Sequence, residues 1–417
     1  MQATASAQAA DPLAGDHSLR KLGALGQGSF GSVGLYQRIG LPLDADGYPQ
    51  DDKVAIKCLP VRCVDFTLVS REVRSHCSLN HPHVILFKRL GLTADRRYIY
   101  LMMEYADSGD LFKYVQQRGR LPEGDARWFF QQIILALDYC HRRGVVNRDL
   151  KLENLLLKSA AEAPPPPGQL EDPRNLHIKV ADFGLCKTAV TSLPKSRVGT
   201  LYYMAPEVLR ASADRPYSGV LSDIWSVGCI LYVLLFKAYP FGSISDRDSR
   251  AQRDAVIRRI ASAEWQLPAS PPVSEACRDL LKRILVPDPG KRITMEGVLN
   301  HPWFLEELPE GARGFNATLV EEQERDPPRC EQSMEEINAI LRSAEAELFR
   351  QPMFPGGGGT GGGAGGLGGL GPGGGGLAGG PDGTMLDAAT AAGGDSGIDG
   401  EIDELHAEHP SLFEMGT

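Results

Sequence analysis

Short apolar runs alternate with polar positions through the N-terminal part of the chain. From about Leu19 to Val54-Ala55-Ile56-Lys57 this alternation, broken by glycines, predicts a strand-rich region. The turn-rich segment 38–53 predicts a long loop between two strands of a hairpin. Residues 64–78 carry apolar positions at helical spacing, which predicts one helix. The apolar face of that helix consists of Phe66, Val69 and Val73.

The pattern becomes mostly helical over residues 111–298. Residues 128–137 (WFFQQIILAL) predict a long buried helix. A proline-rich break at Pro164 to Pro167 predicts a surface excursion at the tip of a hairpin. The globular part ends near His301-Pro302-Trp303-Phe304.

A further amphipathic helix follows after a polar linker. Ser333 and Glu336 have the spacing of a helix capping box, in which each side chain satisfies a backbone amide at the helix start. The apolar positions that follow at helical spacing are Met334, Ile337, Ile340, Leu341, Ala344 and Leu348. An isolated helix of this length is unstable in water, so we expect its apolar face to dock on the folded part of the chain.

The composition is that of an ordinary globular protein, with 42% hydrophobic and 23% charged residues among 417. We find no apolar run of the roughly 18–20 residues that span a bilayer, and the N-terminus does not have the pattern of a secretory signal. The eight cysteines are scattered without a C-x-x-C pair, so we expect free thiols in a reducing compartment. We therefore expect the protein in the cytoplasm, the nucleus or both, without membrane contact.

The net charge of −9 is concentrated near the C-terminal end. Residues 351–417 contain nine acidic side chains and no lysine or arginine, which leaves 44 acidic against 44 basic residues in 1–350. This balance argues against nucleic-acid binding, which needs a basic surface. Residues 356–380 are almost all glycine and predict a flexible tether. The acidic tail beyond it would meet a basic protein partner or keep the chain in solution.

A glycine-rich loop is the first indication of chemistry. Its glycines let the backbone close over phosphates, so that amide groups face the anion. The ATP-binding residues that we assign to this loop are Gly26, Gln27, Gly28, Ser29, Phe30, Gly31 and Val33. Dinucleotide-binding folds share such glycines, but there a helix follows, whereas this loop runs on into strand-like sequence. A Rossmann oxidoreductase is therefore kept only as an alternative.

The strand-like sequence after the loop ends in the V-A-I-K pattern of an ATP site, which includes Ala55 and Lys57. Lys57 would contact the α- and β-phosphates, and Glu72 would hold Lys57 in place. The alternative is that Lys57 and Glu72 form a routine ion pair on the surface. The motifs further along the chain argue against this alternative.

Two segments further along carry the other groups that phosphoryl transfer needs, at the spacing of a protein-kinase catalytic loop. Asp149 is the candidate base for the substrate hydroxyl, and Lys151 would neutralise charge on the transferred phosphoryl group. Asn154 and Asp182 would bind Mg²⁺, a hard cation that favours oxygen ligands.

Together these motifs resemble the eukaryotic protein kinases over residues 19–304. The resemblance continues in Ala205-Pro206-Glu207 and in Arg292, which in that family pairs with the glutamate of this motif. Lys151 and Gly199-Thr200 are similar to the serine/threonine branch. The resemblance implies an α+β, bilobal fold: a small antiparallel-sheet N-lobe with one main helix, and a larger, mostly helical C-lobe. It also implies that Met103 is the gatekeeper and that Glu104 to Ala106 form the hinge that recognises adenine.

Closer still, the chain resembles the plant and algal sucrose-nonfermenting-1-related kinase subfamily 2. The runs that carry this resemblance are 129–132 (FFQQ), 139–141 (YCH), 149–155, 193–196 (LPKS) and 301–305 (HPWFL). In that subfamily a helix after the kinase domain packs on the N-lobe helix that carries the lysine-pairing glutamate, and an acidic extension contacts phosphatases. The expected organisation is a disordered N-terminus (1–18), an N-lobe (19–104), a C-lobe (105–304), a linker (305–332), a docking helix (333–349), a glycine-rich tether (350–384) and an acidic tail (385–417).

Asp110 and Glu153 occupy positions where basophilic kinases bind a substrate arginine, so we expect a preference for Arg-x-x-Ser/Thr. The alternative is two solvated acidic side chains. We expect Arg148 to be buried beside the activation segment and to pair with a phosphate on it. The candidate phosphorylation sites are Thr188, Thr191, Ser192 and Ser196, of which the resemblance favours Ser192 and Ser196.

We therefore expect an active, monomeric serine/threonine kinase that uses Mg-ATP to phosphorylate proteins in stress or nutrient signalling. The alternative is a pseudokinase scaffold that acts through its docking helix and acidic tail, but this chain keeps Lys57, Asp149 and Asp182, which pseudokinases typically lose. Asn147 stands where the family has a histidine that packs beneath Phe183 without transferring protons. We expect the asparagine to cost roughly 1–2 kcal/mol of packing and to loosen the active arrangement.

Overall fold

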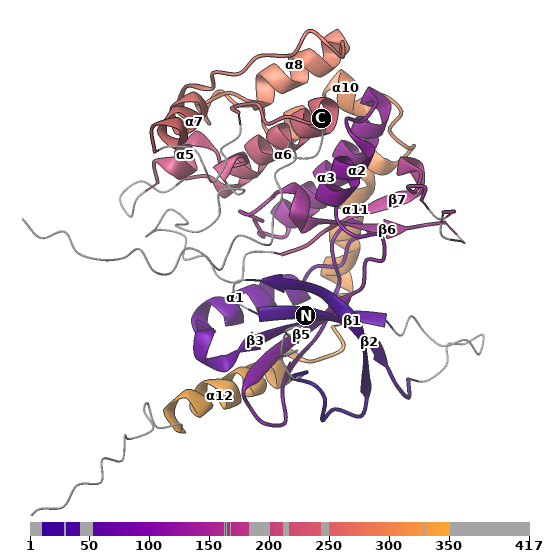
Figure 1. The fold of residues 1–417 in the computed structure, drawn as a ribbon, viewed down its shortest axis with the longest axis vertical. Helices are drawn as coiled ribbons and strands as arrows, with labels where there is room; N and C mark the ends of the chain where they lie inside the picture. Colours follow the sequence, from indigo (N-terminus) through magenta and orange to yellow (C-terminus); the bar gives the residue numbers. More distant parts are fainter. Residues whose placement is uncertain are drawn as a thin grey trace, which may run out of the picture. The chain divides into compact units, whose positions relative to one another are not determined.

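The structure is a computed structural model that describes residues 11–28, 31–41, 53–161, 163, 165–166, 168–182, 201–211, 217–242, 250–327 and 330–350. Five antiparallel strands form the N-lobe sheet in the order β1-β2-β3-β5-β4 (Figure 1). The elements of this lobe are β1 (Leu19–Gly28), β2 (Gly31–Arg38), β3 (Lys53–Pro60), η1 (Val61–Cys63), α1 (Phe66–Cys77), β4 (Phe87–Leu92) and β5 (Tyr98–Glu104). The predicted strand-rich start and the single helix are confirmed, and β2 and β3 on either side of segment 38–53 pair antiparallel as expected, whereas residues 42–52 lie outside the described residues.

Each face of the N-lobe sheet contributes to a separate core. One core joins the sheet to α1, where Val69 and Val73 are buried as the helical pattern predicts. Asp65 begins α1 by accepting hydrogen bonds from the amides of residues 67 and 68. On the other face, Leu13 is buried and the Tyr36 hydroxyl donates to Asp11 Oδ1 at 2.5 Å. The expected disorder of residues 1–18 is therefore wrong for 11–18, because Leu13 fills an apolar site on the sheet.

The C-lobe is built around α3 and α6, which pack on each other. Its elements are α2 (Leu111–Arg118), α3 (Glu123–Arg142), η2 (Leu152–Asn154), β6 (Leu155–Ser159), η3 (Pro173–Asn175), β7 (Leu176–Val180), α5 (Pro206–Leu209), α6 (Gly219–Phe236), α7 (Arg250–Ser262), α8 (Glu275–Ile284), α9 (Met295–Leu299) and α10 (Pro302–Leu305). The strands β6 and β7 pair antiparallel, so the proline-rich stretch lies between the strands of a hairpin as predicted, although Pro164 and Pro167 are outside the described residues. The bilobal α+β fold is thus confirmed.

The helix α6 corrects one expectation about membranes. Over its 18 residues it is long and apolar enough to cross a membrane by length and composition, and it is the one such helix in the described part of the chain. However, 72% of these residues are buried inside the fold. Trp225 of α6 stacks on Phe241 with 5.3 Å between ring centroids. The apolar composition of α6 is therefore accounted for by its place in the C-lobe core.

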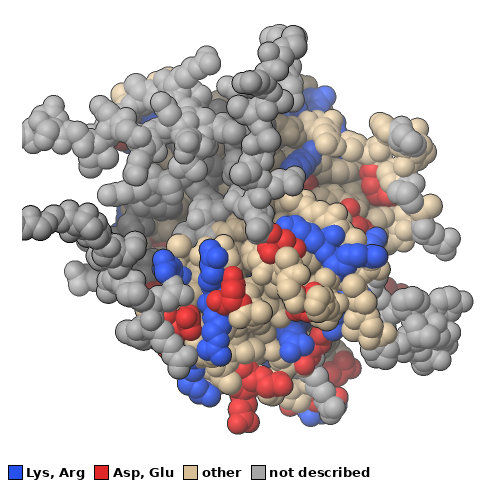
Figure 2. Space-filling view, turned by 60° about the horizontal axis from the view of Figure 1, so that its bottom comes forward, with Lys and Arg blue, Asp and Glu red and all other residues tan. Residues whose placement is uncertain are grey.

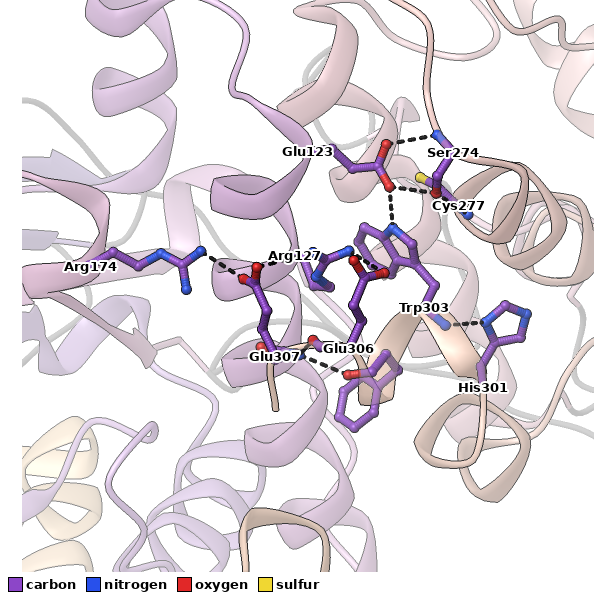
Figure 3. Close-up of polar contacts among 11 residues, drawn as sticks. Glu123, Arg127, Arg174, Ser274, Cys277, His301, Trp303, Glu306 and Glu307 are labelled. Carbon is purple, nitrogen blue, oxygen red and sulfur yellow. Dashed lines mark hydrogen bonds and ion pairs between the residues drawn. The ribbon is translucent and has the colours of Figure 1, made fainter. Parts of the chain in front are cut away.

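A polar network closes the C-lobe after α10 (Figure 3). Arg127 on α3 is buried, with its guanidinium 5.5 Å from the ring centroid of Trp303 and 2.9 Å from Glu306 Oε2. The Trp303 indole N–H donates to Glu123 Oε1 at 2.6 Å, and the same carboxylate accepts from the hydroxyl of Ser274. A buried guanidinium without an acid would be costly, so these contacts fix where the chain leaves the C-lobe.

Two helices follow the C-lobe, α11 (Ala312–Arg325) and α12 (Met334–Arg350). The first corrects the expected linker 305–332, because α11 packs on α3 through two buried polar side chains. The second confirms the docking helix: Ser333 and Glu336 form the capping box, and α12 lies against β4 and α1 (Figure 1). Of the apolar stripe, Ile337, Leu341 and Ala344 are buried in the N-lobe core, Ile340 is partly buried, and Met334 and Leu348 at the ends are exposed.

Basic and acidic side chains are interleaved over the described part of the N-lobe face in Figure 2. This arrangement agrees with the equal numbers of acidic and basic residues in the folded body. The seven cysteines that the structure describes are all free thiols, as expected, whereas Cys186 lies outside the described residues.

Candidate active site

The catalytic loop follows α3 and brings three of the predicted residues together. Lys151 Nζ lies 3.2 Å from Asp149 Oδ2. Asn154 Nδ2 donates to the backbone oxygen of Asp149 at 2.8 Å and lies 3.3 Å from Asp149 Oδ2. All three side chains are buried. The cation and the amide hold the carboxylate of Asp149 in one orientation, as a catalytic base requires.

A buried carboxylate from α6 anchors this loop. Asp223 Oδ2 accepts from the backbone N–H of Asn147 at 3.1 Å and from His141 Nε2 at 2.9 Å. Asp223 Oδ1 accepts from the backbone N–H of Arg148 at 2.9 Å. These bonds hold Arg148 at a φ of 64°, in the left-handed region that non-glycine residues rarely adopt. The Arg148 side chain itself is exposed, so its expected burial is wrong.

The two predicted metal ligands offer suitable oxygen atoms. Asn154 uses its Nδ2 to bind Asp149, which leaves Oδ1 without a hydrogen bond among the described residues. Asp182 follows β7 with a φ of 54° and supplies a carboxylate. This donor set fits a hard divalent cation. In the described part of the chain no three His, Cys, Asp or Glu side chains form a metal cluster, so phosphate oxygens and water would complete the coordination.

Lys57 and Glu72 do not form the expected ion pair. Lys57 Nζ lies 3.8 Å from Asp182 Oδ1, and no ion pair to Glu72 within 4 Å occurs among the described residues. The pKa of Glu72 is raised to about 8, chiefly by burial and also by the nearby charge of Asp182, while Lys57 opposes the shift. Glu72 is thus mostly protonated at neutral pH in this arrangement. Formation of the pair requires Glu72 to approach Lys57 and to release its proton.

The glycine-rich loop connects two antiparallel strands. Gly26 pairs with Val33, and Gly28 pairs with Gly31, at the end of the β1–β2 hairpin. A Cβ atom on Gly31 would collide with the carbonyl oxygen of Cys58 on β3, so this position requires glycine. The loop enters a strand and not a helix, which is unlike the dinucleotide-binding arrangement. Ser29 and Phe30 lie outside the described residues, as does the side chain of Gln27.

The residues expected to form the hinge lie at the end of β5 and just after it, and β5 pairs with β3. Met103 lies opposite Ala55, and Glu104 ends β5 two residues before Ala106. The Glu104 carboxylate lies 3.0 Å from Lys158 Nζ on β6 and 2.8 Å from Lys179 Nζ on β7. Burial alone would raise the pKa of Glu104, but the two ammonium groups outweigh burial and lower it. Glu104 therefore joins the hinge to the C-lobe.

The comparisons with known proteins agree with this geometry. Residues 19–304 match the family model described as "protein kinase domain". Rice (Oryza sativa subsp. japonica) serine/threonine-protein kinase SAPK7 is 41% identical over 293 residues, which cover 70% of this chain and 76% of that protein. Arabidopsis thaliana serine/threonine-protein kinase SRK2E is 40% identical over 277 residues, which cover 66% and 70% respectively.

This chain belongs to the protein kinase family. It is a serine/threonine protein kinase of the sucrose-nonfermenting-1-related subfamily 2 type. The family implies ATP, a divalent metal ion and protein substrates. The pseudokinase and oxidoreductase alternatives therefore lose their support. One expectation from the resemblance is also confirmed in the kinase: Arg292 makes a bidentate pair with Glu207, at 2.6 and 2.9 Å.

The two acids expected to bind a substrate arginine differ in their surroundings. Asp110 caps α2, with Oδ1 accepting from the amide of Lys113 at 2.8 Å and Oδ2 lying 3.1 Å from its ammonium group. Glu153 has a buried Oε2 with no hydrogen-bond partner among the described residues. Burial raises the pKa of Glu153, and the charges of Asp110 and Asp149 raise it further while Lys151 opposes them. A cation next to Glu153 would reverse that shift.

Asn147 is fully buried in the kinase and only partly satisfied. Its Oδ1 accepts from the amide of Asp149 at 3.2 Å, whereas its Nδ2 has no hydrogen-bond partner in the described part of the chain. An unsatisfied buried amide nitrogen costs about 1–3 kcal/mol. Phe183, on which the family's histidine would pack, lies outside the described residues.

Some expectations could not be compared with the structure, and some residues were missed. The candidate phosphorylation sites Thr188, Thr191, Ser192 and Ser196 lie outside the described residues. The role of Asp223 was not predicted, although a lone acid in α6, the most apolar of the described helices, is a signal. The two lysines that bind Glu104 were not predicted either, because isolated surface-type lysines carry no pattern of their own.

Proposed function

We propose that this kinase transfers the γ-phosphoryl group of Mg-ATP to serine or threonine hydroxyls that lie three residues after an arginine, in stress or nutrient signalling. Asp149 accepts the hydroxyl proton, and Lys151 offsets charge on the transferred group. Asn154 and Asp182 would hold a magnesium ion, which would supply charge to screen the phosphates. The orientation of Asp149 by Lys151 and Asn154 is the observation that carries the reaction.

The preference for arginine rests on Glu153. Its buried carboxylate oxygen, which has no hydrogen-bond partner among the described residues, and its raised pKa indicate a site that a cation would stabilise. A guanidinium can bind a carboxylate with two charge-assisted hydrogen bonds, which a lysine or alanine side chain does not reproduce. Asp110 adds negative charge, but it already caps α2, so we expect its contribution to be smaller.

Two peptides that differ only in arginine or alanine three residues before the serine test this preference. We expect kcat/KM to be about 10–100-fold higher for the arginine peptide, since a hydrogen bond to a charged group contributes roughly 1.5–3 kcal/mol. Glu153→Gln should bring the ratio close to one, and Asp110→Asn should lower it less. Equal kcat/KM values for both peptides with the unmodified kinase would contradict the preference.

The remaining proposals concern the metal, the partners and the location. We infer Mg²⁺ because two protein oxygen ligands plus phosphates match its usual sites. Restoration of activity by Mg²⁺ but not by Ca²⁺ after chelation tests this inference.

We also propose that the acidic tail (385–417) contacts a protein phosphatase. Co-purification of the phosphatase with the kinase, with and without the tail, tests this proposal. We further infer a monomer in the cytoplasm, the nucleus or both, which light scattering and imaging of a fluorescent fusion test.

A further inference from the structure

The helix α11 carries two polar side chains that face inward. Asn316 is 1% exposed and Gln323 is 7% exposed, although the other positions of α11 are mainly exposed or partly exposed. The two residues lie seven positions apart, which is two turns, so they share one helix face. Buried polar side chains require hydrogen-bond partners, and here the partners come from both lobes.

Asn316 connects the loop after α1 to α3. Its Nδ2 donates to the backbone oxygen of Leu135 at 2.8 Å and to Asp138 Oδ2 at 2.9 Å, both on α3. Its Oδ1 accepts from His81 Nε2 at 3.1 Å, in the loop that leads from α1 to β4. The His81 ring stacks on Tyr139 with 4.9 Å between centroids. Burial lowers the pKa of His81 to about 4, so the ring is neutral and Nε2 carries the donated hydrogen.

Gln323 makes a second set of hydrogen bonds, which involve Asn80, the residue before His81 in the same loop. Its Nε2 donates to the backbone oxygen of Asn80 at 2.7 Å, and its Oε1 accepts from the Tyr139 hydroxyl at 2.6 Å. The Tyr139 oxygen in turn accepts from the backbone N–H of Asn80 at 2.9 Å. Both backbone groups of Asn80 are thus held by α3 and α11 together.

The loop that contains Asn80 and His81 is also bonded to the end of α1. His76, near the end of α1, hydrogen-bonds to the backbone oxygen of Ile85 at 2.8 Å. Ile85 itself donates to Val180 of β7 at 3.0 Å. After α11 the chain reaches the outer side of α1, where Asn338 of α12 accepts from Arg74 at 2.8 Å. The C-terminal end of α1 is therefore held through the loop, and its outer face is held by α12.

We propose that α11 is a bracket between the lobes, in which Asn316 and Gln323 are positioning residues. They hold residues 80 and 81 against α3 and so set the end of α1 from which Glu72 must approach Lys57. This role goes beyond the docking of α12 and does not depend on the substrate preference. The bracket acts on the kinase through α1 and touches neither ATP nor substrate.

Gln323→Met and Gln323→Glu test the bracket in the full-length kinase. Methionine keeps the volume but removes both hydrogen bonds, and we expect kcat to fall about 5–10-fold with little change in KM for the peptide. Glutamate keeps the acceptor for Tyr139 but, when ionised, faces the oxygen of Asn80. Because burial raises the pKa of such a carboxyl, protonation at lower pH restores the donor. The ratio of variant to unmodified kcat should therefore rise as the pH falls from about 8 to about 6.

Glu324→Gln, on the exposed side of α11, is the matched control and should leave kcat unchanged. Hydrogen exchange supplies an independent measurement: in Gln323→Met we expect faster exchange in residues 69–85, with α6 unaffected. The proposal is overturned if kcat of both Gln323 variants equals that of the control at every pH. It is also overturned if exchange accelerates equally in α6, because the change would then be global destabilisation.

Discussion

The catalytic loop and α1 carry groups for the same reaction but are held in different ways. Asp149 lies in a loop whose backbone is bonded to Asp223, inside the C-lobe core. Glu72 lies on a helix that packs on one side of a sheet, and it is not paired with Lys57 in this structure. The loop depends on contacts within the kinase domain, whereas α1 also depends on α11 and α12, which follow that domain in sequence.

The catalytic loop carries the groups for the reaction, whereas α1 controls whether Glu72 can reach Lys57. Residues buried in one rigid core keep their geometry at little further cost, so the base and its neighbours are ready before substrate binds. A helix that is held partly by later segments can shift when those segments change their contacts. We therefore expect changes in the loop to remove activity and changes around α1 to modulate it.

The largest effect should come from Asp149→Asn. The asparagine can keep an oxygen near Lys151 and Asn154, but it does not accept the hydroxyl proton, so kcat should fall by about 10²–10⁴-fold. Thermal unfolding should change little because the loop stays anchored by Asp223. A peptide phosphorylation assay and a melting curve measure both. More than a tenth of the activity remaining would show that another group is the base.

The next effect concerns α12. Ile337 is fully buried against α1 and β4, so Ile337→Ala should lower the free energy of unfolding by roughly 2–5 kcal/mol and lower kcat severalfold. Leu348 belongs to the same stripe but is exposed, and Leu348→Ala should cost less than about 0.5 kcal/mol. Urea unfolding and the peptide assay compare the pair. Equal effects of the two changes would mean that α12 does not support α1.

The hinge offers a test with a defined pH dependence. Glu104→Gln removes the charge that binds Lys158 and Lys179, so the free energy of unfolding should fall by roughly 1–3 kcal/mol and KM for ATP should rise. The folded pKa of Glu104 is lowered, so its stabilisation is complete above the ordinary value of about 4.3 and is lost as pH falls through the lower folded value.

The difference between the unmodified kinase and Glu104→Gln should therefore be constant from about pH 8 to about pH 5 and shrink only at lower pH. Urea unfolding at several pH values follows this difference. A difference that disappears already near neutral pH would contradict the ion pairs.

The smallest effect should come from Asn147→His. The Nδ2 of the asparagine, which has no hydrogen-bond partner among the described residues, disappears, and a larger ring takes its place. Stability should therefore rise by about 1 kcal/mol, and kcat should rise modestly. Melting curves and the peptide assay suffice to measure this. No change in either would show that asparagine is already well accommodated.

Much of the site could be predicted because its residues are close in sequence. Asp149, Lys151 and Asn154 lie within six positions, so their spacing nearly determines their separation in space. The missing pair between Lys57 and Glu72 could not be predicted, because the distance between β3 and α1 depends on how the whole N-lobe packs. The anchoring role of Asp223 could not be predicted for a related reason: its partners precede it by more than 70 residues.

The two helices after the C-lobe illustrate the same limit. The apolar stripe and the capping box of α12 are defined by local spacing and can be recognised in the sequence alone. The structure confirms both. The inner face of α11 is polar, and hydrophobic periodicity does not detect a face that is buried through hydrogen bonds. Asn316 and Gln323 became recognisable only once His81 and Asn80 stood opposite them.

By itself, the sequence determined the fold class, the order of the catalytic groups and the family of this kinase, because these depend on local spacing and on apolar periodicity. Only the tertiary structure decided that Asp223 anchors the loop, that Glu72 stands apart from Lys57 and that α11 joins both lobes. Such contacts connect segments far apart in the chain. Their geometry follows from the packing of whole elements, which no local pattern encodes.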